Sequence, residues 1–209
     1  MGDVSSRLQG NDDDGQPGNP NEVVRVRNVD MYVTYNAENH FTRGFARTKS
    51  QKPAPVLRRG QSFTIVINFN RPFNPETDSL SLFFGVEGEN RTTYSKGATA
   101  LVPVDFRSAE ALSSGTWSAV VRKSEEKALL IEVMTPATCI VGSWIMDVDT
   151  KMRNVVESVG ARLHLPGTPI YILFNPWCKE DLVYMENPEA RFEYVLAHSG
   201  IIWRGTMKL

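Results

Sequence analysis

The feature that most constrains the fold is a series of short segments in which apolar and polar side chains alternate. The clearest segment covers 63–69, where four large apolar residues occupy every second position: Phe63, Ile65, Ile67 and Phe69. Period-two alternation places such side chains on one face of a β-strand. The pattern recurs around 24–29, 80–84, 117–121, 129–133 and 144–148. Because each strand must bury one apolar face, the series predicts an all-β fold, an antiparallel immunoglobulin-like β-sandwich.

Two other kinds of segment flank the predicted strands. The stretch 11–20 contains aspartate, glycine, asparagine and proline but no apolar side chain to bury, so residues 1–20 are predicted to be a disordered tail. Only 188–197 reads as a helix, because Pro188 suits a first helical turn and apolar residues recur at helical spacing. We therefore divide the chain into a tail (1–20), a sandwich (21–187) and a C-terminal segment (188–209).

Composition excludes several classes of function. The formal net charge is −1, without the basic excess that a nucleic-acid surface needs. The longest apolar runs, such as 169–174, fall far short of the roughly 20 residues of a membrane-spanning helix. Gly2 and Ser6 match the template for N-myristoylation, so membrane association is expected only if Gly2 is acylated. Two cysteines do not make a disulfide framework and fit a reducing, cytoplasmic compartment.

The cysteines are the candidate nucleophiles. Cys139 is followed by Ile140 and Val141, which favours a packing role. Spacing alone does not exclude a triad of Cys178 with Asp181 and His198, since a thiolate needs only a base in hydrogen-bond reach. Cysteine is, however, among the most often buried residue types. We therefore interpret both cysteines as buried structural thiols and predict no catalytic residue.

Metal and cofactor sites are also not predicted. The three histidines, His40, His164 and His198, are far apart in sequence, and no Cys-x-x-Cys or His-x-x-x-His pair is present. Gly85-Val86-Glu87-Gly88 places an acid where a phosphate would bind, so it is interpreted as a turn.

Two segments invite closer interpretation. The pair Arg58–Arg59 precedes Gly60 and the strongest strand, and two interpretations remain open: a contact with an acidic partner, or a solvated turn in which Gly60 takes a positive φ. The run 172–184 leaves an apolar strand through a Pro-Trp-Cys corner. Here Phe174 and Trp177 are expected to anchor the edge of the core.

A series of short motifs resembles the N-terminal domain of animal transglutaminases. The motifs, in chain order, are Asn36–Thr42, Leu57–Phe63, Trp117–Ala119, Pro136–Thr138 with Val141–Gly142, Leu173–Cys178, Glu193–Leu196 and Gly205–Thr206. Together they cover about 23–206, nearly all of the predicted folded chain. The first departs from the family pattern, since Phe41 replaces its second histidine.

The resemblance implies a β-sandwich that precedes a papain-like catalytic core and two small β-barrels. The full enzyme would join glutamine to lysine side chains by calcium-dependent acyl transfer, through a cysteine in a Gly-Gln-Cys-Trp turn. Neither Cys139 nor Cys178 lies in such a turn. The chain is therefore expected to be non-catalytic, to bind no cofactor, and to leave the calcium sites to the catalytic domain.

The resemblance also implies partners and a location. Segment 188–209 would be the bridge to the catalytic core, which is the expected intramolecular partner. The expected interdomain contacts are Arg58, Arg59, Phe192, Tyr194 and Trp203. Matrix or other proteins are further expected partners. The two cysteines favour a cytoplasmic location, with membrane association if Gly2 is acylated, or non-classical secretion, as the alternatives. The alternative is a self-contained binding or regulatory module without crosslinking activity.

Overall fold

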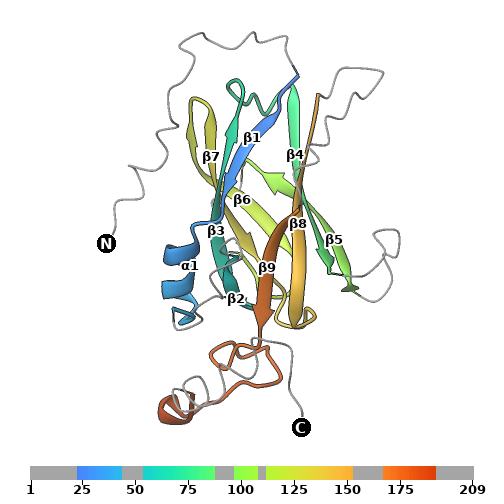
Figure 1. Ribbon diagram of the computed structural model, residues 1–209. Coiled ribbons are helices and arrows are strands. Elements are labelled where there is room, and N and C mark those ends of the chain that lie inside the picture. The colour runs from blue at the N-terminus through green and yellow to red at the C-terminus, as the bar shows by residue number, and fades with distance from the viewer. Residues whose placement is uncertain (1–22, 44–53, 88–96, 108–111, 153–166, 192–209) are drawn as a thin grey trace.

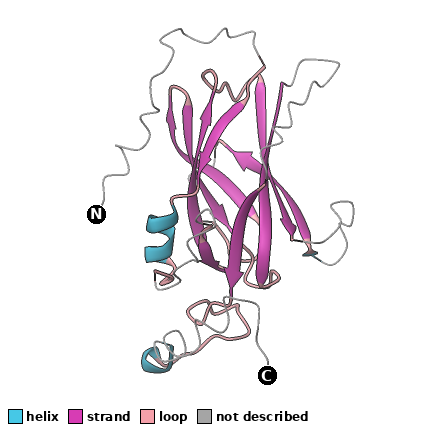
Figure 2. Cartoon of the chain, in the orientation of Figure 1, coloured by secondary structure: helices cyan, strands magenta, loops and turns pink. Residues whose placement is uncertain are grey.

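The computed structural model describes residues 23–43, 54–87, 97–107, 112–152 and 167–191. In chain order its elements are β1 (Val26–Asp30), α1 (Val33–Asn39), β2 (Val56–Arg58), β3 (Ser62–Phe69), β4 (Asp78–Val86), β5 (Thr99–Asp105), β6 (Ser118–Glu125), β7 (Ala128–Met134), β8 (Gly142–Met152) and β9 (Thr168–Leu173). Strands dominate the fold, and α1 lies beside them (Figures 1 and 2). No helix within these ranges is long and apolar enough to cross a membrane.

The strands form two layers that share one strand. The order is β1-β3-β7-β6-β5-β4-β8-β9-β2. The first half of β5 pairs antiparallel with β4, and its Val104 and Asp105 pair in parallel with β6 in the other layer. The predicted all-β sandwich is confirmed. Its sheet is mixed, however, because β2 also pairs in parallel with β9, and alternation along one strand does not encode the direction of its partner.

The core lies between the layers and contains the predicted apolar faces. Phe63 of β3 and Phe84 of β4 meet edge to face across it, with ring centroids 6.4 Å apart. Phe84 stacks on Trp117 at 4.4 Å, and Trp117 lies against the fully buried Trp144 of β8. Aromatic rings from segments far apart in sequence thus join both layers into one core.

Helix α1 was not predicted by the sequence analysis, which assigned a helix only to 188–197. Seven residues are too few to establish an apolar stripe, and what fixes α1 is the buried side chain of Asn36. Its amide donates to the Met31 and Thr64 carbonyls, each at 2.7 Å, and accepts from the Thr64 N–H at 2.9 Å. Asn36 therefore binds the helix to β3 much as a neighbouring strand would. The predicted second helix does begin at Pro188, and its residues 192–197 lie outside the described ranges.

Candidate functional site

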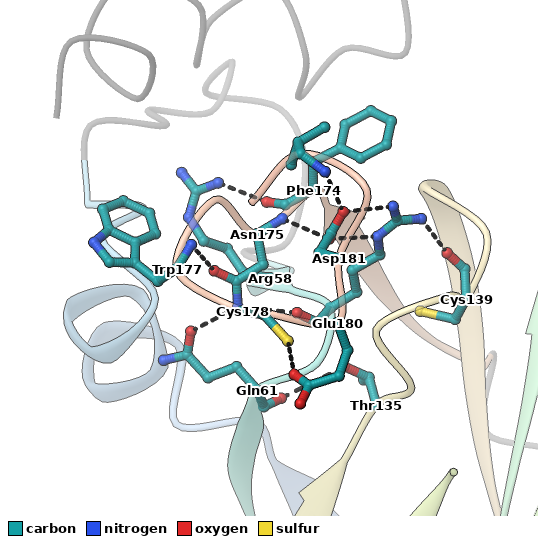
Figure 3. A network of polar contacts seen from close by, with 12 residues as sticks. Arg58, Gln61, Thr135, Cys139, Phe174, Asn175, Trp177, Cys178, Glu180 and Asp181 are labelled. Carbon is teal, nitrogen blue, oxygen red and sulfur yellow. Dashed lines mark hydrogen bonds and ion pairs between the residues drawn. The ribbon is translucent and has the colours of Figure 1, made fainter. Parts of the chain in front are cut away.

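One end of the sandwich gathers segments from four parts of the chain. The segment after β9 turns beneath the sheets, where Trp177 stacks on Phe41 at the end of α1 and Asp181 contacts Arg59 (Figures 1 and 3). Arg59, in the β2–β3 turn, also bonds to Cys139 of the β7–β8 loop. Five buried polar residues contact one another or the backbone of these segments, and we refer to them as the end network: His40, Arg58, Arg59, Asn175 and Asp181.

The strongest contact of the end network joins Arg59 to Asp181, 122 residues later. The guanidinium donates from Nε to Oδ2 at 2.6 Å and from Nη2 to Oδ1 at 2.7 Å, with both side chains buried. Its Nη1 donates to the Cys139 carbonyl at 2.9 Å. Burial disfavours the charged guanidinium, but the hydrogen bonds and charge of Asp181 outweigh it and raise the pKa of Arg59 above its usual value.

Asp181 also shapes the segment that carries it. Its carboxylate accepts from the N–H groups of Asn175 at 2.9 Å and Val183 at 3.1 Å. The Asn175 side chain donates to the Arg59 carbonyl at 2.9 Å and accepts from the Trp177 N–H at 3.1 Å (Figure 3). The loop after β9 is therefore closed on itself and attached to the β2–β3 turn by the same two side chains.

Arg58 holds the opposite side of the network through contacts with His40 and with the Phe174 carbonyl. Its Nε donates to the His40 carbonyl at 2.9 Å, and its Nη1 donates to the Phe174 carbonyl at 2.8 Å. The Arg58 N–H donates to His40 Nδ1 at 2.8 Å, while His40 Nε2 lies 3.0 Å from the Ser62 carbonyl. Since Nδ1 accepts, Nε2 must carry the proton, and the ring is neutral. Burial, together with Arg58, lowers the pKa of His40 to about 4.

The interpretation of Arg58–Arg59 as a solvated turn is wrong in its main point. The two residues are only 2% and 5% exposed, because Asp181, Phe174 and His40 provide partners that a local sequence window does not contain. Gly60 does take the predicted positive φ, at 68°. The interdomain contact of Arg58 and Arg59 stays a prediction. Phe192, Tyr194 and Trp203 lie outside the described residues.

The two cysteines are buried, as predicted. Burial raises the pKa of Cys139 to about 12, although the charge of Arg59 opposes the shift. Burial also raises the pKa of Cys178, whose Sγ donates to Glu180 Oε2 at 3.1 Å. Of the triad considered for Cys178, Asp181 is bound to Arg59, and His198 lies outside the described residues. Both environments therefore favour the thiol over the nucleophilic thiolate.

Trp177 does not lie where an anchor of the core edge was expected. It is half-buried and stacks on the half-exposed ring of Phe41, with centroids 5.0 Å apart. The Arg58 guanidinium lies 5.2 Å from the Trp177 ring. Phe174, also half-buried, contacts the guanidinium of Arg59 at 4.6 Å. The two aromatic residues thus cover the arginines of the end network, outside the core between the sheets.

Sequence reasoning missed His40 and Asn175 as members of this site. The sequence did contain a signal for them, because the motifs Asn36–Thr42, Leu57–Phe63 and Leu173–Cys178 are segments that meet at this site and include both residues. Across the described ranges, no three or more histidine, cysteine or acidic side chains are grouped as a metal site would require. What the arrangement does chemically is to hold four segments together through buried polar contacts.

Comparisons with known proteins give a consistent result. The model of the transglutaminase family matches residues 27–151. Annulin of Schistocerca americana is 39% identical over 186 residues, which cover 88% of this chain and 23% of annulin. The hemocyte protein-glutamine gamma-glutamyltransferase of Tachypleus tridentatus is 34% identical over 194 residues, covering 92% of this chain and 25% of that protein. The chain therefore spans about a quarter of the length of these relatives.

The fold is similar to that of a solved structure. The crystal structure of red sea bream transglutaminase superposes with a TM-score of 0.59 at 21% identity, over 82% of this chain and 22% of that one. At this identity the likeness concerns the fold of the sandwich.

Proposed function

The chain belongs to the transglutaminase family, and from that premise we propose that it is the non-catalytic N-terminal β-sandwich of a protein-crosslinking enzyme. In that enzyme a cysteine thiol of a separate catalytic domain would take the acyl group of a glutamine side chain as a thioester, with release of ammonia. A lysine amine would then accept the acyl group and free the thiol. The similarity to the Tachypleus relative, a protein-glutamine gamma-glutamyltransferase, supports this class of reaction. Calcium would be required by that catalytic domain.

The observation that carries the proposal is the chemical state of the two thiols. A catalytic cysteine is activated by a neighbouring base or by an environment that lowers its pKa. Burial raises the pKa of both Cys139 and Cys178, and the group bonded to the Cys178 sulfur is the carboxylate of Glu180. A negative charge at that position disfavours the thiolate further.

The end network suggests what the sandwich contributes to such an enzyme. Arg58, Arg59 and Asn175 fix the segment after β9 at one end of the sheets, so the polypeptide leaves the domain along a defined path. The longer relatives extend well beyond the matched region. We infer that the network sets the position from which the catalytic domain, the intramolecular partner, would follow.

The proposal is tested by an acyl-transfer assay on the 209-residue chain. The chain is incubated with calcium, a labelled primary amine and a glutamine-rich acceptor protein, beside an active crosslinking transglutaminase as positive control. Incorporation of the amine should not exceed that of a calcium-free blank. Calcium-dependent incorporation that disappears in Cys178→Ala would contradict the proposal, because this thiol would then be a nucleophile.

A further inference from the structure

His40 occupies a position that accepts only a neutral imidazole. The side chain is fully buried, its Nδ1 accepts from the Arg58 N–H at 2.8 Å, and its Nε2 donates to the Ser62 carbonyl at 3.0 Å. A second proton would have to sit on Nδ1, where it would face the Arg58 N–H as donor against donor. A protonated ring therefore cannot keep both contacts.

The charges around the ring add to this conflict. From β2, the Arg58 guanidinium opposes a second positive charge. From β3, Ser62 offers its carbonyl, and its hydroxyl is bonded to Glu132 of β7. Of the charged side chains in the described neighbouring segments, Glu38 pairs with Arg43 and Arg59 pairs with Asp181. Among the described residues, no carboxylate is hydrogen-bonded to the ring, so none of them stabilises its cationic form.

The contacts of His40 continue through Arg58 to the backbone carbonyl of Phe174 and to the ring of Trp177. The His40 carbonyl accepts from Arg58 Nε, and the same guanidinium reaches Phe174 and lies near Trp177. The next residue, Phe41, is held at φ 54°, a conformation that a bulky side chain rarely adopts, and it stacks on Trp177. Loss of the His40 contacts would thus remove the support of Arg58 and of this stack together.

We propose that His40 is an acid-sensitive contact between α1 and β2. Its protonation releases the end of α1 from β2 and loosens the segment after β9, while the two sheets stay folded. The released unit is defined by hydrogen bonds, namely those of the Arg58 N–H to His40, the Thr42 hydroxyl to the Val56 carbonyl, and the Arg58 guanidinium to Phe174. Local openings of this kind require less free energy than global unfolding in folded proteins. The inference goes beyond the proposed function and does not depend on it.

The direction of the pH effect follows from linkage. The pKa of His40 is about 4 in the closed form and near the ordinary 6.5 once released, so the open form binds more protons. The stabilisation by the neutral ring is fully present above about pH 6.5 and is lost as the pH falls toward about 4. Between about pH 7.5 and about pH 5, the open population should rise roughly 30-fold.

Amide hydrogen exchange, divided by the intrinsic rate at each pH, measures this population. The chain has three histidines, so His164→Gln and His198→Gln give a background in which His40 is the only one. The reporters are the amides of Thr42 and Arg58, and the references are those of Ile65 and Leu82 in the core strands. At about pH 5 the reporter amides should exchange through opening more readily than the reference amides. Between about pH 7.5 and about pH 5 the open population that they report should rise roughly 30-fold. Equal opening of reporters and references at that pH would overturn the local release.

A matched variant separates His40 from the carboxylates that also titrate. His40→Gln in the same background keeps an acceptor and a donor but cannot take up a proton. The rise in reporter opening should fall below about threefold in this variant, and an unchanged rise would refute the role of His40. Should the variant not fold, the ring of His40 is titrated directly by NMR. The proposal is supported if the neutral ring carries its proton on Nε2 and if its protonation midpoint lies well below pH 6.5. A midpoint near pH 6.5 contradicts it.

Discussion

Arg58 and Arg59 are neighbours in sequence, yet their buried guanidinium groups are stabilised in different ways. Arg59 faces a carboxylate in bidentate geometry, whereas Arg58 donates to two carbonyl groups. A buried ion pair gives little net stability compared with apolar residues, but removal of one partner leaves an uncompensated buried charge. The pair Arg59–Asp181 is therefore the contact of the end network that is most sensitive to a single substitution.

Asp181→Asn should lower the free energy of unfolding by about 3–5 kcal/mol, because it strands the Arg59 guanidinium without a counter-charge. Urea titration followed by circular dichroism measures the change. The control is Glu132→Gln, since the carboxylate of Glu132 pairs with Arg122 at sites that are 28% and 30% exposed. This control should cost about 0–1 kcal/mol. Equal effects of the two variants would mean that Asp181 is more hydrated than its contacts indicate.

At the residue scale, sequence predicted burial of the thiols but not of the arginines. Cys139 and Cys178 follow the general tendency of their residue type, so no partner needed to be known. Arg58 and Arg59 oppose the tendency of theirs, and the partner that makes burial of Arg59 tolerable lies 122 residues away. A pattern within one window carries no information about such a partner.

The β2–β3 turn is the element that brings the end network together. Gly60 allows it, with φ 68° and with the sulfur of Cys178 close to the place where a Cβ would lie. A Cβ at Gly60 would lie 2.5 Å from Cys178 Sγ and 3.0 Å from the Ala137 Cβ. The turn therefore needs glycine for two separate reasons, its backbone conformation and the space it leaves.

Gly60→Ala should lower the free energy of unfolding by roughly 2–5 kcal/mol. Of this, about 1–2 kcal/mol comes from an alanine in the left-handed conformation and about 1–3 kcal/mol from overpacking against Cys178 and Ala137. Gly97→Ala isolates the first of these effects. Gly97 has a similar φ of 70°, but nothing lies within 4 Å of a Cβ placed there, so this variant should cost only about 1–2 kcal/mol. Thermal or urea unfolding of both variants gives the difference. A Gly60 variant as mild as the Gly97 variant would show that Cys178 moves aside freely.

At the element scale, alternation located the strands whose one face is apolar and missed the elements defined by tertiary contacts. β3, β4, β7 and β8 contain the predicted residues. β2 has three residues, too few for a period, and exists through its pairing with β9. Helix α1 depends on the buried amide of Asn36 rather than on an apolar stripe. Short elements of this kind become recognisable only when their neighbours are known.

For the whole molecule, β5 decides whether the two layers behave as one unit. Its Thr99–Pro103 portion belongs to the layer of β4, and its Val104 and Asp105 pair with β6. Val104 is buried in the core that both layers share, while Leu101 on the same strand is 54% exposed. Because one strand and one core connect the layers, we expect them to unfold in a single cooperative transition.

Val104→Ala tests this coupling, since it removes buried methyl groups at the point where β5 passes from one layer to the other. It should lower the free energy of unfolding by about 1–3 kcal/mol, from lost burial and the cavity left behind. Leu101→Ala, on the exposed side of β5, should stay within about 0.5 kcal/mol of the original chain. Far-ultraviolet circular dichroism and tryptophan fluorescence, followed in urea, should give one coincident midpoint for each variant. Two separated transitions in Val104→Ala would mean that the layers fold independently and that β5 is only a link between them.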